Sequence, residues 1–218
     1  MSCELDHLVV AARTLDEGVA WCEAMLGVIP TGGGKHALMG THNRVMSIAS
    51  PQWPRAYLEF IAVDPQAPHP GRARWFDLDS PAMHERLARG PRLVHWVARC
   101  DDIELRSTRW RGVDADPGDV LAAERQTERG WLRWRISMRP DGVRLFDGAW
   151  PTLIQWDGPH PTDTMAPGGV VLQQVNVRGL PSHAWDECRA TGVSTADHGP
   201  ALSARLTTPR GLVELNSD

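Results

Sequence analysis

Four polar residues in apolar segments, His7, Glu59, His95 and Gln155, are the first candidates for chemistry. Glu59 is the only charged residue in the segment 57–63, and a carboxylate in so apolar a strand is costly unless it is paired or binds a cation. Two imidazoles, a carboxylate and an amide oxygen suit a divalent ion such as zinc, nickel, cobalt, manganese or iron. We therefore expect these four side chains to converge on one metal site.

Each of these residues also has a structural interpretation. A single His on a strand is usually a hydrogen-bonded structural residue, which applies to His7 and to His95. Glu59 can pair with Arg44, which is predicted on the neighbouring strand. Gln155 suits an organic ligand or a backbone group better than a metal, because its amide is neutral.

A second group of candidates surrounds a run of three glycines. Residues 31–36 and 40–44 are predicted to form a loop at the mouth of a cleft, because glycines let a backbone approach a ligand closely. The spacing does not match a phosphate-binding loop, and a plain turn between strands is the alternative. His69 and His160 lie in proline-rich loops and are expected in solvent. The candidate substrate-binding residues are His36, His42, Asn43, Arg44 and Trp156.

An internal repeat supplies the elements that hold these residues. Residues 5–17 and 93–104 each contain a short apolar strand with a His near its start, followed by a helix cap. Residues 170–177 are a weaker third copy, with Gln in the place of His. If this third copy rather than the second completes the cleft, Gln174 and Glu214 replace the polar pair of the second copy. The sequence leaves this choice open.

The repeat predicts an α+β fold with the order β-α-β-β-β, again β-α-β-β-β, and then an abbreviated β-α-β-β. Capping signals place helix starts at Thr14 (a capping box with Glu17), Asp101 and Ser182, and helix ends at Gly27, Gly112 and Gly192. The strands that follow the three helices are predicted at 28–35, 43–49 and 56–63, then 120–127, 131–138 and 151–156, and finally 201–207 and 211–215. The predicted parts of one compact domain are a first module (1–64), a connector (65–91) with a short helix at 80–90, a second module (92–157) and a third copy (169–218).

Four segments together form a recognisable pattern: Leu5-Asp6-His7-Leu8-Val9-Val10 with its capped helix, Gly40-Thr41-His42-Asn43-Arg44, Tyr57-Leu58-Glu59-Phe60 and Leu153-Ile154-Gln155-Trp156-Asp157. In these segments the sequence resembles the glyoxalase-like domains of the vicinal oxygen chelate superfamily. The resemblance covers roughly residues 4–160 and, more vaguely, the third copy. It implies half-barrel modules around a cleft, with metal ligands on the first and last strand of each module. His7, Glu59 and His95 match those positions by type, whereas Gln155 departs from the carboxylate common there.

The resemblance also implies an activity. A divalent ion bound to two substrate oxygens would lower the pKa of a neighbouring C–H group, and Glu59 would move the proton. The first hypothesis is therefore a metal-dependent lyase or isomerase, such as a lactoylglutathione lyase, acting on a small oxygenated molecule. An extradiol dioxygenase ranks lower, because those enzymes draw two His and one Glu from one half of the fold. The alternatives are a resistance-type protein that binds a small molecule without reaction, and an interaction module that dimerises through exposed sheet edges.

Composition excludes several other classes. The chain has 218 residues with 23 Lys and Arg against 27 Asp and Glu, giving a net charge of −4. This balance disfavours nucleic acid or an anionic membrane as a partner. With no signal peptide and no apolar run near about 20 residues, we expect a cytoplasmic protein. The four cysteines show neither disulfide nor zinc-cage spacing. Lys35 is the only lysine, a bias typical of a GC-rich bacterial genome, and it disfavours Schiff-base chemistry.

Overall fold

The computed structural model describes residues 3–218, so Met1 and Ser2, with which the predicted first module begins, lie outside the described residues. The order strand, helix, three strands occurs twice along the chain, as predicted. Its first occurrence comprises β1 (Cys3–Ala11), α1 (Leu15–Leu26), β2 (Gly32–His36), β3 (Thr41–Ser47) and β4 (Tyr57–Val63). After the connecting helix α2 (Pro81–Leu87), the second comprises β5 (Arg92–Arg99), α3 (Ile103–Arg111), β6 (Asp119–Thr127), β7 (Gly130–Met138) and β8 (Thr152–Trp156).

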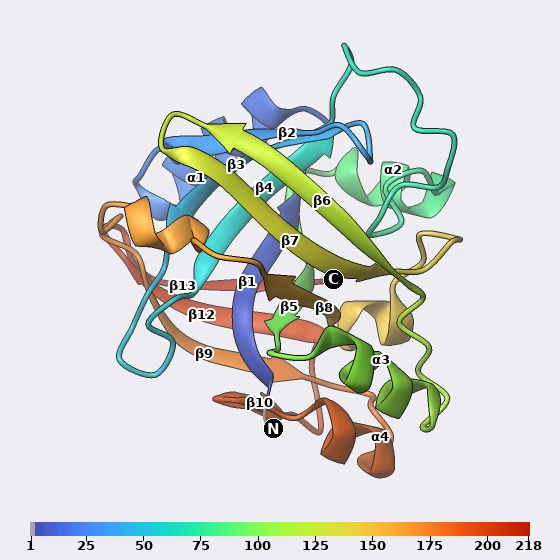
Figure 1. Cartoon of the computed structure of the whole chain (residues 1–218). Coiled ribbons are helices and arrows are strands. Elements are labelled where there is room, and N and C mark those ends of the chain that lie inside the picture. The colour runs from blue at the N-terminus through green and yellow to red at the C-terminus, as the bar shows by residue number, and fades with distance from the viewer. Residues whose placement is uncertain (1–2) are drawn as a thin grey trace.

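The eight strands of the two units form one curved sheet. Its order is β2-β3-β4-β1-β5-β8-β7-β6, and β1 and β5 join the two halves as an antiparallel pair in which Val9 lies opposite His95. The sheet curls until its edge strands approach each other, because a Cβ atom added at Gly34 of β2 would lie only 2.6 Å from Cδ of Arg125 of β6. Figure 1 shows the β6–β7 hairpin crossing over the strands of the first unit. The concave face of this sheet can therefore enclose a site.

The C-terminal part forms a second sheet. Its elements are β9 (Val171–Val177), α4 (Ser182–Cys188), β10 (Ala190–Thr191), β11 (Val193–Thr195), β12 (Leu202–Thr208) and β13 (Gly211–Asn216). Four of these strands pair in the order β11-β9-β12-β13, while the short β10 extends the first sheet by pairing with β1. The second sheet, red and orange in Figure 1, packs on the convex face of the first, where Leu8, Trp96, Leu172 and Leu206 share one core.

This arrangement answers the question of which copy completes the concave face. The second copy does so through the β1–β5 pairing. Gln174 of the third copy donates to Asn176 on β9, and half-exposed Glu214 lies 3.8 Å from Arg205 on the second sheet. Both alternative candidates therefore belong to the second sheet and contribute nothing to the concave site.

Strand alternation separates two cores. On β4, Leu58 and Phe60 join the outer core under the helices, whereas Ile61 joins an inner core on the concave face. Because side chains of a strand point alternately to opposite faces, Tyr57 and Glu59 share the inner face with Ile61. The inner core also includes aromatic residues from the connector between the two units, which lies over the concave face.

Helix boundaries follow the predicted caps only in part. Thr14 accepts from the backbone N–H of Glu17 and Gly27 adopts a φ of 76°, as the sequence predicts for α1. The Glu17 carboxylate binds Arg13 instead of closing the capping box. Asp102 rather than Asp101 caps α3. Helix α4 starts without a side-chain cap and ends before Arg189, not at Gly192. In the described part of the chain, no helix is long and apolar enough to cross a bilayer.

Candidate functional site

His7 and Glu59 face each other across the concave side of the sheet. Strands β1 and β4 are parallel neighbours, and Nε2 of His7 lies 3.6 Å from Oε2 of Glu59. Both residues are only 5% exposed, which makes the carboxylate dependent on its polar neighbours. The Tyr57 ring stacks on the imidazole of His7 at a centroid distance of 4.5 Å, which restricts the orientation of that imidazole.

Strands β2 and β3 bring two more polar side chains to Glu59. Asn43 donates from Nδ2 to Oε1 of Glu59 at 2.6 Å, and Nε2 of His36 lies 3.9 Å from the same oxygen. Arg125, from β6 across the sheet opening, donates to Oδ1 of Asn43 at 3.2 Å. This contact directs the Asn43 amide N–H groups toward Glu59. Oε1 is thus already bound, whereas Oε2 faces Nε2 of His7 at 3.6 Å.

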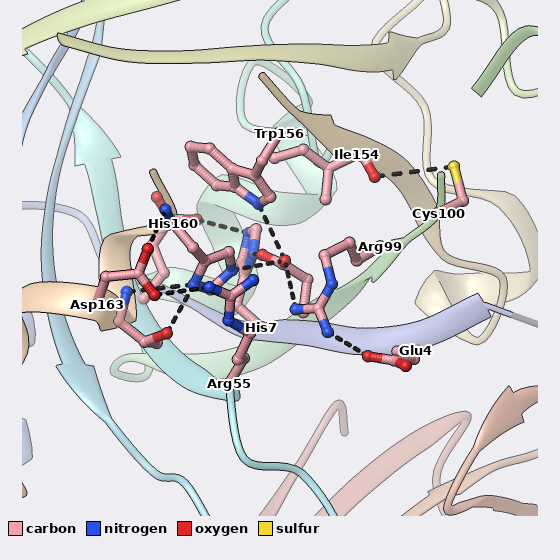
Figure 2. A network of polar contacts seen from close by, with 12 residues as sticks. Glu4, His7, Arg55, Arg99, Cys100, Ile154, Trp156, His160 and Asp163 are labelled. Carbon is pink, nitrogen blue, oxygen red and sulfur yellow. Dashed lines mark hydrogen bonds and ion pairs between the residues drawn. The ribbon is translucent and has the colours of Figure 1, made fainter. Parts of the chain in front are cut away.

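Asp6 fixes the other side of His7. Its Oδ1 lies 2.7 Å from Nδ1 of His7, and its Oδ2 accepts from Trp156 and lies within hydrogen-bond distance of Nε2 of His160, both at 3.0 Å. Figure 2 shows His7, Trp156 and His160 converging from three separate segments, with Arg99 beside them. Because Asp6 is fully buried, these partners replace the solvent that its charge would otherwise need.

The protein environment shifts the pKa values of the buried groups in different directions. Burial alone raises the pKa of Asp6, but the hydrogen bonds from His160 and His7 outweigh it, and its pKa falls well below the ordinary value. Burial lowers the pKa of His36 to about 4, with Glu59 opposing this shift and Arg125 adding to it. Burial raises the pKa of Tyr57 well above its ordinary value. Asp6 is therefore ionised at neutral pH, while His36 and Tyr57 are uncharged.

The space beside Glu59 is small and leads to a much larger cleft. An inner pocket of about 40 Å³ is closed by aromatic and aliphatic side chains as well as by the polar group around Glu59. A cleft of about 1090 Å³ lies between β2, the β6–β7 hairpin and residues 159–168. Both spaces are lined by Val45, Arg125 and Pro161, so the inner pocket lies at one end of the cleft.

The glycine run makes this opening possible. Gly32, Gly33 and Gly34 belong to strand β2, in agreement with the strand predicted at 28–35 and not with the loop predicted at 31–36. A Cβ atom at Gly34 would meet Arg125 at 2.6 Å, and one at Gly33 would meet the backbone oxygen of Asn43 at 2.2 Å. Only glycine therefore allows the Arg125 side chain to pass across the edge of β2 and reach Asn43.

The structure does not bring the four predicted metal ligands together. His95 faces a separate cavity, where its Nε2 lies 3.0 Å from Oγ1 of Thr152, and the Phe76 ring packs against it at 4.9 Å. Gln155 lies on the convex side, where its Oε1 accepts from the first backbone N–H of α3. Strand β8 instead directs Ile154 and Trp156 into the inner pocket, because adjacent side chains alternate between faces.

A metal ion does not fit the donor set that is present. Among residues 3–218, no group of three or more His, Cys, Asp and Glu side chains is arranged to hold one. His36 approaches Glu59, but the Asn43 amide lies between them, 3.3 Å from Nε2 of His36 and 2.6 Å from the carboxylate. An N–H donor repels a cation rather than binding it.

The predicted substrate-binding residues lie on opposite faces of the first sheet. His36, Asn43 and Trp156 line the inner pocket. His42 and Arg44 lie on the opposite face of β3, where Arg44 is exposed and donates to the backbone oxygen of Asn43, so it does not pair with Glu59. Burial lowers the pKa of half-buried His42.

The prediction that both loop histidines lie in solvent is wrong for one of them. His69 is exposed, but His160 is 1% exposed and binds Asp6. Sequence reasoning also missed Asp6 and Arg125 as site residues. The signal for Asp6 was available, since an Asp next to His7 in an apolar strand needs a buried partner as much as Glu59 does.

Comparisons with known proteins identify relatives of the fold. A family model described as a glyoxalase-like domain matches residues 5–191. No protein of curated function matches the sequence. A hypothetical protein from Staphylococcus aureus is 16% identical with a TM-score of 0.56, over 98% of this chain and 86% of that one. The methylmalonyl-CoA epimerase of Mycobacterium tuberculosis is 18% identical with a TM-score of 0.41, over 75% of this chain and 92% of that one.

Proposed function

The chain belongs to the glyoxalase-like domain family of the vicinal oxygen chelate superfamily, and we propose that it is an isomerase or lyase that moves a proton on a small oxygenated substrate. The observation that carries this proposal is the environment of Glu59. It is a buried carboxylate in the lining of the inner pocket, with one oxygen bound to Asn43 and the other 3.6 Å from Nε2 of His7. A buried base in a pocket with oriented polar neighbours is typical of a catalytic site.

The proposed step is proton transfer from a carbon next to a carbonyl group. Oε2 of Glu59 takes the proton as the C–H bond breaks, and the electron pair moves to the carbonyl oxygen to form an enolate. The proton then returns to a carbon of the enolate, either to the other face or to the neighbouring carbon. No oxidant or other reactant is required, and Glu59 ends ionised as it began.

Asn43 and Asp6 position the two reacting side chains. Asn43, itself held by Arg125, binds Oε1 of Glu59 and leaves Oε2 available. Asp6 accepts the Nδ1 proton of His7, so Nε2 of His7 faces Oε2 of Glu59. His7 can then exchange a proton with Glu59 through Nε2 between the two transfers.

The donors around Glu59 do not fit a divalent metal, so no step is assigned to one. His95 and Gln155, the other predicted ligands, bind Thr152 and the start of α3. Stabilisation of the enolate oxygen falls instead to N–H donors at the pocket. Arg125 is suited to this role, because its buried Nε has no hydrogen-bond partner among the described residues and its side chain lines both the pocket and the cleft.

The sizes of the two spaces limit the substrate. A pocket of about 40 Å³ accepts only the reacting end of a molecule, while the rest would lie in the cleft of about 1090 Å³. Arg125 at their junction favours a carboxylate or another oxyanion on the substrate. Binding without reaction is the second candidate function. The Asn43 N–H group beside Glu59 and the position of Gln155 on the convex side favour it over the metal-dependent alternatives.

Solvent exchange tests the proposal without knowledge of the true substrate. Pyruvate and methylglyoxal are incubated with the protein in D₂O, and loss of the methyl proton signals is followed by ¹H NMR. We expect wild-type protein to accelerate exchange for at least one compound and Glu59→Gln to lose about 10²-fold or more of that rate. Glu124→Gln, the same change at an exposed position on β6, is the control. Exchange that is equal in Glu59→Gln and wild type overturns the proposed role of Glu59.

A further inference from the structure

A second cavity lies on the other side of Phe76 from the Glu59 pocket. Its volume is about 40 Å³, and Trp75 and Phe76 line both cavities. Its other walls come from the second half of the sheet and from the segment before β8. They include His95, Arg144, Trp150 and Thr152. This space is separate from the proposed reaction.

Three residues that line this cavity each carry a buried nitrogen atom that has no hydrogen-bond partner among residues 3–218. These atoms are Nδ1 of His95, Nε1 of Trp75 and Nε1 of Trp150, on residues that are 2%, 8% and 1% exposed. A buried N–H group without a partner costs about 1–3 kcal/mol, so three around one small cavity require an explanation. An indole N–H can only donate, so at least two of the three groups need an acceptor.

The two arginines near the cavity are already paired with acceptors of the protein. Arg144 donates from Nε to Asp77 at 2.6 Å and from Nη1 to the backbone oxygen of Val94 at 2.5 Å. Arg139 at the rim is paired with Asp141 at 2.6 Å. No carboxylate lines the cavity itself among the described residues. The free groups that remain are donors, and the Arg144 guanidinium adds a positive charge at the wall.

We propose that this cavity binds a small planar oxyanion or carboxylate, with the indole N–H groups of Trp75 and Trp150 as its main donors. A space of about 40 Å³ accommodates roughly three water-sized groups. That is the size of formate, nitrate or the carboxylate end of a larger molecule. Water fits less well, because it brings two protons of its own and no carboxylate among the described lining residues is there to accept them.

His95 is consistent with this occupant. Burial lowers the pKa of His95 well below its ordinary value, and the positive charge of Arg144 adds to this shift, so the imidazole is neutral. The Thr152 hydroxyl can donate to Nε2, which places the single ring proton on Nδ1. In that tautomer His95 adds a third N–H donor to the cavity. His95 then serves this cavity instead of a shared metal centre.

Indole N–H signals in ¹H–¹⁵N NMR spectra of the full chain test the proposal directly. Sodium formate is titrated against a background of constant ionic strength kept with sodium chloride. A ligand of three heavy atoms cannot bind more tightly than about 0.5 mM, so we expect saturation in the millimolar range. The signals of Trp75 and Trp150, assigned from Trp75→Phe and Trp150→Phe, should shift most.

The variants provide the decisive comparison. Trp150→Phe should weaken formate binding about tenfold, as expected for a lost hydrogen bond to an anion. Trp185→Phe on α4, which does not line the cavity, should leave it unchanged. Equal affinity in Trp150→Phe and wild type, or shifts that never saturate, would overturn the proposal. Since the readout is binding, the result does not depend on whether the chain catalyses proton transfer.

Discussion

Replacement of Asp6 by Asn should remove the hydrogen bond to His7 and keep those to Trp156 and His160. Asp6 receives His7 on one oxygen and both Trp156 and His160 on the other. An Asn side chain has the same shape but only one acceptor oxygen, so one side must face an NH₂ group. Keeping the oxygen on the Trp156–His160 side retains two hydrogen bonds and turns the NH₂ group toward His7.

The loss of stability in Asp6→Asn follows from the hydrogen bond that the variant loses. One buried charge-assisted hydrogen bond contributes about 1.5–3 kcal/mol, and for a chain of this size each kcal/mol shifts Tm by about 2–4 °C. We therefore expect Asp6→Asn to lower Tm by about 3–12 °C. Because its pKa is lowered in the fold, Asp6 stabilises the protein above the unfolded-state pKa of about 3.9. That contribution disappears as the pH falls below this value, and in the variant it is absent at every pH.

The assay combines urea unfolding, followed by tryptophan fluorescence at pH 7 and pH 3, with ¹⁵N NMR of the histidine rings, because pH 3 lies below the unfolded-state pKa of Asp6. In Asp6→Asn the proton of His7 should move from Nδ1 to Nε2, because Nδ1 must accept from the new NH₂ group. Asp157→Asn, at an exposed carboxylate 3.9 Å from Arg135, should change stability by less than about 0.5 kcal/mol. An unchanged His7 tautomer together with unchanged unfolding of Asp6→Asn would refute the reasoning.

Three further predictions concern separate parts of the chain. Because the pKa of His36 is lowered to about 4 in the fold, only the unfolded state takes up a proton at this residue between pH 7.5 and pH 5. The free energy of unfolding should therefore fall by about 2 kcal/mol over this range. In urea titrations, His36→Gln should remove this part of the pH dependence. Gly34→Ala should displace Arg125 and reduce any solvent-exchange rate about tenfold, with a normal Tm as the sign that the fold is intact. Thr14→Ala should lower the free energy of unfolding by about 1 kcal/mol in the same urea assay, since it removes the cap of α1.

Local signals predicted most elements correctly, because caps and alternation act over a few residues. Thr14 and Gly27 bound α1 as predicted, and the alternation in β4 directs Glu59 inward. The resemblance to glyoxalase-like domains is confirmed, as is the α+β class. Gln155 shows where such reasoning fails: the face of a strand residue depends on pairing with distant strands, and a one-residue difference reverses it.

The remaining site residues depend on contacts that no local pattern encodes. His160 binds Asp6 across 154 residues, and the proline-rich sequence around it predicts only a surface loop. Arg125 meets Asn43 because the two edges of the curled sheet approach each other. The glycines of β2 indicate a close approach of the backbone, but their partner, Arg125, depends on the curvature of the whole sheet.

The rate of C–H exchange with solvent after chelator treatment tests the central claim most directly. Wild-type protein and Glu59→Gln are dialysed against EDTA. Their rates of C–H exchange in D₂O are then compared on a compound whose protons the wild-type protein exchanges. We predict that wild-type protein keeps its exchange rate after dialysis and that Glu59→Gln loses at least about 10²-fold. Loss of the wild-type rate on dialysis with recovery on adding a divalent ion, or a full rate in Glu59→Gln, would contradict proton transfer by Glu59 without a metal.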